Sequence, residues 1–150
     1  MIVENLGAIY TQFKLNFYRQ ILKRFDNREA TLTALEIFCV ETIHAMNQPT
    51  INKFAEFLQI SQANAAYKVG KLVGKGYVNK VQSKNDKREF FLDVTEKFAN
   101  YYNINTAYMK TVAQRINERF CKDELKKLDE FLNIIATELM PEVALCEGVQ

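Results

Sequence analysis

The sequence lacks most of the features that mark enzymes and metal proteins. It has no glycine-rich phosphate loop, and its single histidine, His44, has no constellation of paired acids around it. Its three cysteines, Cys39, Cys121 and Cys146, are an odd number, lie far apart and show no CxxC or Cys/His spacing. They predict neither a disulfide framework nor a zinc site, and they fit a reducing compartment. We expect no enzymatic activity, no cofactor and no metal.

Targeting and membrane signals are also missing. No apolar run approaches the length needed to cross a bilayer, and the first residues do not combine a basic run, a short apolar stretch and a cleavage site. We expect a cytoplasmic protein with no membrane partner. Repeats and Ser/Gly linkers are absent, and 150 residues with 48% hydrophobic content suffice for one core. The prediction is a single domain over residues 1–150.

Basic charge is concentrated in one segment. Residues 61–88 contain seven basic residues and one acid, a net charge of +6, whereas the rest of the chain has 13 basic and 17 acidic residues. A positive surface on an otherwise acidic body indicates a polyanionic partner.

Helical periodicity covers the first 46 residues. Apolar residues recur every three or four positions between residues 6 and 25, which predicts a first helix. Thr33 and Glu36 have capping-box spacing and open a second helix over about 33–46. The apolar stripe expected on this second helix consists of Leu35, Phe38, Cys39, Ile43 and Met46.

Two short helices follow, joined by a very short link at residues 59–60. Thr50 and Ser61 are their expected N-caps, and Gly76 stands where a left-handed residue ends the second one. Two helices joined by a tight turn are the sequence form of a helix-turn-helix.

The pattern then changes to a hairpin and returns to helix. Segments 77–82 and 89–94 are typical of strands around a polar tip. A long helix starts after Thr95, its expected N-cap, and breaks near Cys121-Lys122. The final helix carries a narrow apolar seam of Leu125, Leu128, Leu132, Ile135 and Leu139. The predicted fold class is mainly α with a small β-hairpin wing, a winged helix-turn-helix over about 31–97 embedded in a helical dimerisation domain, about 1–30 and 98–150.

The second helix of the helix-turn-helix has the residues needed to contact DNA. Its buried side is predicted to be Ala65, Val69, Leu72 and Val73. Amides pair with adenine, tyrosine reaches a phosphate or a thymine methyl, and lysines neutralise phosphates. A solvated basic face is the alternative interpretation, but the coincidence with a basic hairpin favours DNA. The candidate DNA-binding residues of this element are Ser61, Gln62, Asn64, Tyr67, Lys68, Lys71 and Lys75.

The hairpin tip supplies a second candidate contact. Lys84, Lys87 and Arg88 are placed to meet the DNA backbone or a minor groove, whose negative potential attracts arginine. Asp86 is included in the candidate site because it either orients the Arg88 guanidinium or initiates the turn.

These segments resemble the MarR-type multiple-antibiotic-resistance regulators. The resemblance rests on four stretches, namely residues 32–36, Ile60-Ser61, residues 72–78 and residues 86–97. It implies a homodimer, joined through its first and last helices, that represses transcription from palindromic double-stranded sites. It also implies release by a small molecule in the cleft between the dimerisation and DNA-binding parts. Two positions depart from the pattern: Tyr67-Lys68 replaces a usual arginine, and Phe98 replaces a usual glycine.

The sequence therefore predicts a sequence-specific DNA-binding regulator, with a winged-helix protein-interaction subunit as the alternative. The eighteen aromatic residues either line an effector pocket or form core. The operator, the regulated genes, the effector, and the choice between repression and activation are not specified by these patterns, nor is oxidant sensing by a cysteine.

Overall fold

The computed structural model describes residues 1–26 and 32–143. The predicted boundary at residue 31, and Cys146, lie outside this part of the chain. The elements in order are α1 (Ile2–Asp26), α2 (Ala34–Ala45), α3 (Ile51–Leu58), α4 (Gln62–Gly74), β1 (Val78–Gln82), β2 (Phe90–Val94), α5 (Glu96–Arg119), α6 (Lys122–Glu138) and the 3₁₀ helix η1 (Pro141–Val143). The predicted fold class, helices with one small antiparallel hairpin, is confirmed.

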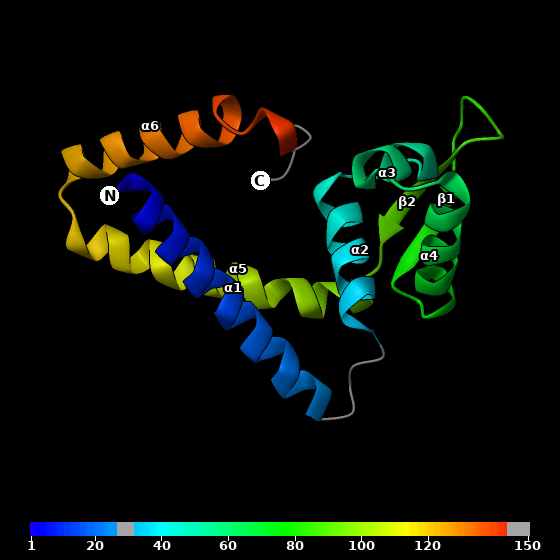
Figure 1. The fold of residues 1–150 in the computed structure, drawn as a ribbon, viewed down its shortest axis with the longest axis horizontal. Helices are drawn as coiled ribbons and strands as arrows, with labels where there is room; N and C mark the ends of the chain where they lie inside the picture. The colour runs from blue at the N-terminus through cyan, green and yellow to red at the C-terminus, as the bar shows by residue number, and fades with distance from the viewer. Residues whose placement is uncertain (27–31, 144–150) are drawn as a thin grey trace.

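The molecule has two parts (Figure 1). α2, α3, α4 and the hairpin form the winged helix at one end, and α5 leaves the hairpin to extend away from it. α1 crosses α5, where the Phe13 and Tyr108 rings meet edge to face at 5.3 Å, and α6 runs back toward the winged helix. Among the described helices, none is both long and apolar enough to cross a membrane.

Local signals set the helix ends as predicted. At Thr33 both hydrogen bonds of the capping box are present. Gly76, directly after the C-cap of α4, has a φ of +79°. The N–H groups of Gly76 and Tyr77 donate to the carbonyls of Val73 and Leu72, respectively. This is the Schellman arrangement that a glycine accommodates without Cβ strain.

The core lies mainly in the winged helix. The fully buried side chains there include Val40, Phe54, Leu72, Tyr77 and Leu92. The hairpin pairs Val78 with Val94, and the N–H of Leu92 also donates to the carbonyl of Pro49 at 2.8 Å. These bonds fix the hairpin beside α2 and α4.

Three sequence expectations about burial and capping were wrong. Leu35 and Phe38 are exposed, because the core side of α2 is formed instead by Ile37, Cys39, Val40 and Ile43. Val73 of α4 is also exposed. Thr95 does not cap α5 with its side chain, since its hydroxyl donates to the Gly76 carbonyl at 2.7 Å.

Phe98, where the sequence departs from the family pattern, is buried in the first turns of α5 against the His44 ring. The helix begins normally at Glu96. An aromatic residue at this position therefore adds to the core instead of disturbing the helix start.

Candidate nucleic-acid interface

The predicted helix-turn-helix is present in α3 and α4. The Thr50 hydroxyl accepts from the N–H of Lys53, and the Ser61 hydroxyl accepts from the N–H of Asn64, both at 3.2 Å. Between the helices Gln59 adopts a left-handed conformation with φ of 55°, and the N–H of Ile60 donates to the Ala55 carbonyl. This tight turn holds α4 across α3.

α4 buries one face and exposes a polar one. Ala65, Val69 and Leu72 are buried, whereas the remaining polar face turns outward. Of the candidate residues on this helix, Lys68 is half-buried and the exposed ones are Ser61, Gln62, Asn64, Tyr67 and Lys71. Ser61, Gln62, Asn64 and Tyr67 lie at the N-cap and in the first two turns of α4. This is the part of a recognition helix that meets base edges.

Lys71 and Tyr67 form a pair on this face. The Lys71 Nζ lies 4.7 Å from the centre of the Tyr67 ring. The pKa of Lys71 is raised, first by its hydrogen bond with the Tyr67 hydroxyl. A lysine held charged beside a phenol offers a cation and a hydroxyl to the same phosphate.

Lys75 is engaged inside the protein. Its Nζ donates to Glu36 Oε2 at 2.7 Å, and that oxygen also accepts from the Thr33 N–H at 2.7 Å. Burial acts to raise the pKa of Glu36, but the bonds from Lys75 and Thr33 outweigh it and the pKa is lowered. This geometry points Lys75 toward α2 rather than toward a ligand.

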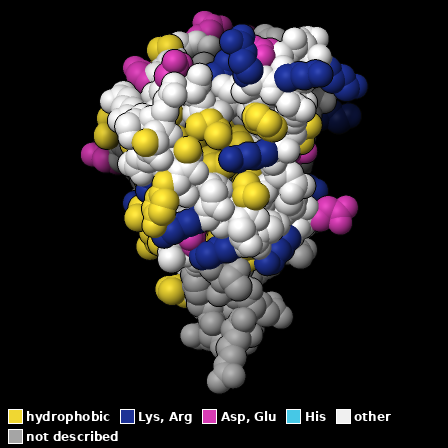
Figure 2. Space-filling model, turned by 90° about the vertical axis from the view of Figure 1, so that its right-hand side faces the viewer, with side chains coloured by type: hydrophobic (Ala, Val, Ile, Leu, Met, Phe, Trp, Pro, Cys, Tyr) yellow, Lys and Arg dark blue, Asp and Glu magenta, His cyan; other side chains and the backbone are white. Residues whose placement is uncertain are grey.

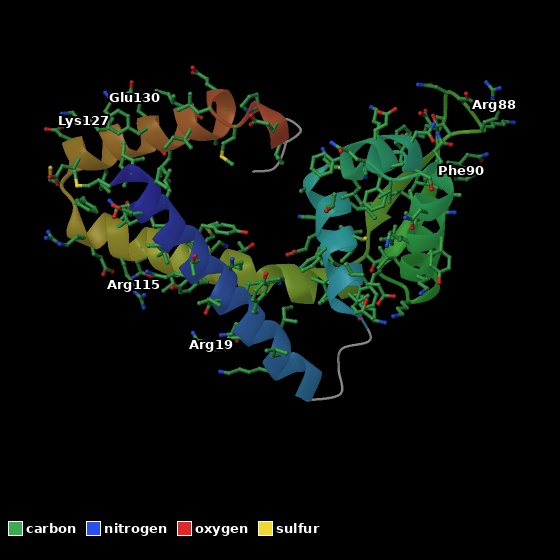
Figure 3. The ribbon with its side chains drawn as sticks, viewed as in Figure 1. Arg19, Arg88, Phe90, Arg115, Lys127 and Glu130 are labelled. Carbon is green, nitrogen blue, oxygen red and sulfur yellow. The ribbon has the colours of Figure 1, made fainter. Side chains whose placement is uncertain are left out.

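The wing tip is held by a compact hydrogen-bond set. The Ser83 hydroxyl accepts from the N–H groups of Asn85 and Asp86. Asp86 accepts both from the backbone N–H of Arg88 at 2.9 Å and from its guanidinium at 3.2 Å, which lowers the pKa of Asp86. Asp86 therefore fills both of the roles considered for it. Lys84, Lys87 and Arg88 are exposed around the tip, and Figure 3 shows Arg88 at this end of the wing.

A groove of about 750 Å³ separates the wing from the helix-turn-helix. Three of the candidate residues, Gln62, Asp86 and Arg88, line it together with the first residues of α3. Phe90 forms part of its wall, and Figure 3 shows Phe90 and Arg88 on the same strand end of the wing. Figure 2 views this end of the molecule, where Lys and Arg side chains are spread around an apolar patch. The other candidates lie outside the groove lining.

Of the described residues, Cys39, Cys121 and His44 form no metal site. Within residues 1–26 and 32–143 no three His, Cys, Asp or Glu side chains come close enough to hold a metal. Cys39 is buried, which raises the pKa of its thiol, and Cys121 is exposed at the start of α6.

Sequence reasoning missed two acids. Glu36 was assigned only to a helix cap, and its bond to Lys75 joins residues 39 positions apart, beyond any local pattern. Glu41 was not singled out, although an acid between Val40 and Ile43 on an apolar helix is a visible signal.

A known protein family matches the segment that carries the candidate interface. The model of the MarR family matches residues 32–90. The match shows that this part of the chain is similar to the MarR family. The matched segment contains α2, α3, α4, β1 and the wing tip and ends at the first residue of β2, so it includes every candidate DNA-binding residue.

Solved structures extend the likeness to the flanking helices. A MepR variant from a multidrug-resistant S. aureus clinical isolate has a TM-score of 0.65 and 16% identity, covering 93% of this chain and 98% of that one. Transcriptional regulator Tm0710 from Thermotoga maritima has a TM-score of 0.62 and 17% identity, covering 89% of this chain and 90% of that one. Streptococcus pneumoniae FabT, solved in complex with DNA, has a TM-score of 0.58 and 18% identity, covering 92% of this chain and 94% of that one. At these identities the likeness establishes the fold. No curated protein gives a match.

Proposed function

We propose that this chain is a sequence-specific regulator of transcription that binds double-stranded DNA as a homodimer. The observation that carries the proposal is the exposed polar face of α4, capped at Ser61, beside a wing whose Arg88 is oriented by Asp86. The match to the MarR family model and the likeness in fold to FabT, whose structure is a complex with DNA, support the same function.

The division of labour on α4 follows from its geometry. Gln62 and Asn64 stand in the first turn, where amides meet adenine edges. Lys71 lies near the end of the helix with Tyr67, and both suit a phosphate. Arg88 and the neighbouring wing lysines extend the contact to the backbone or the next minor groove.

Repression relieved by a small molecule completes the proposal. A homodimer on a palindromic site covers a promoter symmetrically, and a ligand that changes the distance between the two α4 helices lowers affinity for that site. The exposed apolar residues of α1 and α6 support pairing of two copies.

A selection of bound sequences from random duplex DNA tests this function. We expect an inverted repeat, with half-sites one or two helical turns apart. Affinity for the selected duplex should fall steeply with salt, as phosphate contacts require. If no sequence is enriched and affinity is weak at every salt concentration, a protein-interaction subunit is the correct interpretation.

Two substitutions separate base contacts from phosphate contacts. Gln62→Ala should change the preferred base at one position in each half-site, by about 1 to 3 kcal/mol for a bidentate contact. Lys71→Ala should weaken selected and random duplexes alike. Base preferences that survive Gln62→Ala and Asn64→Ala would place direct readout on other residues.

A further inference from the structure

A second pocket, of about 340 Å³, lies on the side of α2 that faces away from the core. It is formed by α2, the end of α3 and η1, so it joins the winged helix to the end of the last helix. Its lining includes Phe38, Glu41, Thr42, Met46, Phe57 and Val143. Phe38 is one of the residues expected in the core, and its exposure in this pocket explains that error.

Among the described residues that line this pocket, Glu41 is the one with a charged side chain. Burial raises its pKa to about 7, and burial is the only cause of the shift. A carboxyl in apolar surroundings without a nearby cation is costly to ionise. Such a group is retained more readily where it has a ligand to meet.

The charged neighbours on the surrounding elements do not compensate Glu41. On α2 itself, His44 packs against Phe98. On α3, Lys53 and Glu56 are exposed and outside the lining, and on η1 Glu142 is exposed and acidic. The sequence of residues 144–150 contains no Lys or Arg.

We propose that this pocket binds a small molecule with an apolar body and one positive charge. Glu41 supplies the opposite charge, and the faces of Phe38 and Phe57 attract cations through their ring quadrupoles. The volume is within the range of small-molecule sites. The inference rests on the effector part of the proposed function, for which it specifies the site and the chemical class of the ligand.

Calorimetry with matched probes tests the proposal on the full chain without DNA. The probes are benzyltrimethylammonium, its uncharged carbon isostere 2,2-dimethylpropylbenzene, and phenylacetate. Binding should be strongest for the cation and weakest for the anion. Glu41→Gln should weaken binding of the cation about tenfold, the size of one charge-assisted contact, and leave the uncharged probe unchanged. Glu56→Gln, an acid outside the lining, is the matched control and should change neither.

The pH dependence reports on the same carboxyl, because the charge of the quaternary ammonium is fixed. Affinity of the wild-type chain for the cation should fall as the pH drops below about 7 and Glu41 becomes protonated, by about tenfold in total, the loss expected for Glu41→Gln. Glu41→Gln should abolish this slope. Thermal melting of each variant verifies that it is folded.

Three results would each overturn the proposal that this pocket binds an apolar cation. No binding of the cation, equal binding of cation and uncharged isostere, or a Glu41→Gln affinity equal to wild type each overturns the proposal. Because no DNA is present, any of these results leaves DNA binding standing. Conversely, a chain that binds the cation but no DNA retains this pocket and loses the proposed function.

Discussion

The winged helix and the long helices differ in how completely they bury their apolar residues. Phe17 and Ile21 are the only buried apolar side chains described outside residues 32–98. α6 has none; Phe131 and Leu132 on this helix and Leu139 at its C-cap are more than half exposed. The winged helix therefore has a sufficient core of its own, whereas α1 and α6 present apolar faces that call for another surface. A second copy of the chain is the partner that we propose for them.

The largest expected difference between the winged helix and the long helices is in the effect of two matched phenylalanine substitutions on stability. Phe54→Ala removes a fully buried ring and should lower the free energy of unfolding by about 3 to 5 kcal/mol at any protein concentration. Phe131→Ala removes a ring that is 58% exposed, so its effect should be smaller and should depend on protein concentration, because Phe131 acts through association. Denaturant unfolding at two concentrations measures both. Equal, concentration-independent losses would contradict the distinction.

A charge in the α6 seam should separate the two copies. Wild-type protein should sediment at twice the 17.4 kDa chain mass, and Leu132→Asp should sediment as one chain at micromolar concentration. Val81→Asp is the matched control, because Val81 is also about half exposed but lies on the wing, and it should remain dimeric. A wild-type monomer would remove the dimer and the palindromic site together.

Lys75, the C-cap of α4, should affect stability, whereas Lys71 on the same helix should affect DNA binding. Lys75→Ala breaks the bond to Glu36 and should cost about 1 to 2 kcal/mol of stability, whereas Lys71→Ala should leave stability unchanged and weaken DNA binding. The Lys75 effect should disappear with acid: the pKa of Glu36 is lowered on folding, so its stabilisation is present above the ordinary value of 4.5 and is lost as the pH falls through the folded value. Thermal melts across pH measure this. A Lys75→Ala effect that persists at low pH would assign it to another contact.

The smallest expected effect is in the turn of the helix-turn-helix. Gln59→Gly should raise stability by about 0.5 to 1 kcal/mol, since glycine adopts the left-handed φ of 55° without Cβ strain. Glu56→Gly, three residues earlier within α3, should lower stability by about 1 kcal/mol. If both substitutions shift melting in the same direction, the turn is not strained.

Sequence reasoning succeeded where signals are local. The caps Thr33, Ser61 and Gly76 act through bonds within a few residues, so their spacing alone located α2 and α4. Sequence reasoning failed where contacts between residues far apart in the chain decide which side chains are buried or bonded. Nothing near Lys75 shows that it reaches Glu36, and the stripe containing Phe38 is compatible with burial on either side of α2. Which side is core depends on where α3, α4 and the hairpin pack.

The composition of the protein–DNA complex tests the account most directly. Sedimentation of the chain with the selected duplex should give two chains per duplex, with Arg88→Ala weakening the complex and Leu132→Asp reducing it to single chains of low affinity. A complex of one wild-type chain per duplex at full affinity, or no complex with any duplex, would contradict the claim that the winged helix binds DNA while the long helices pair two copies.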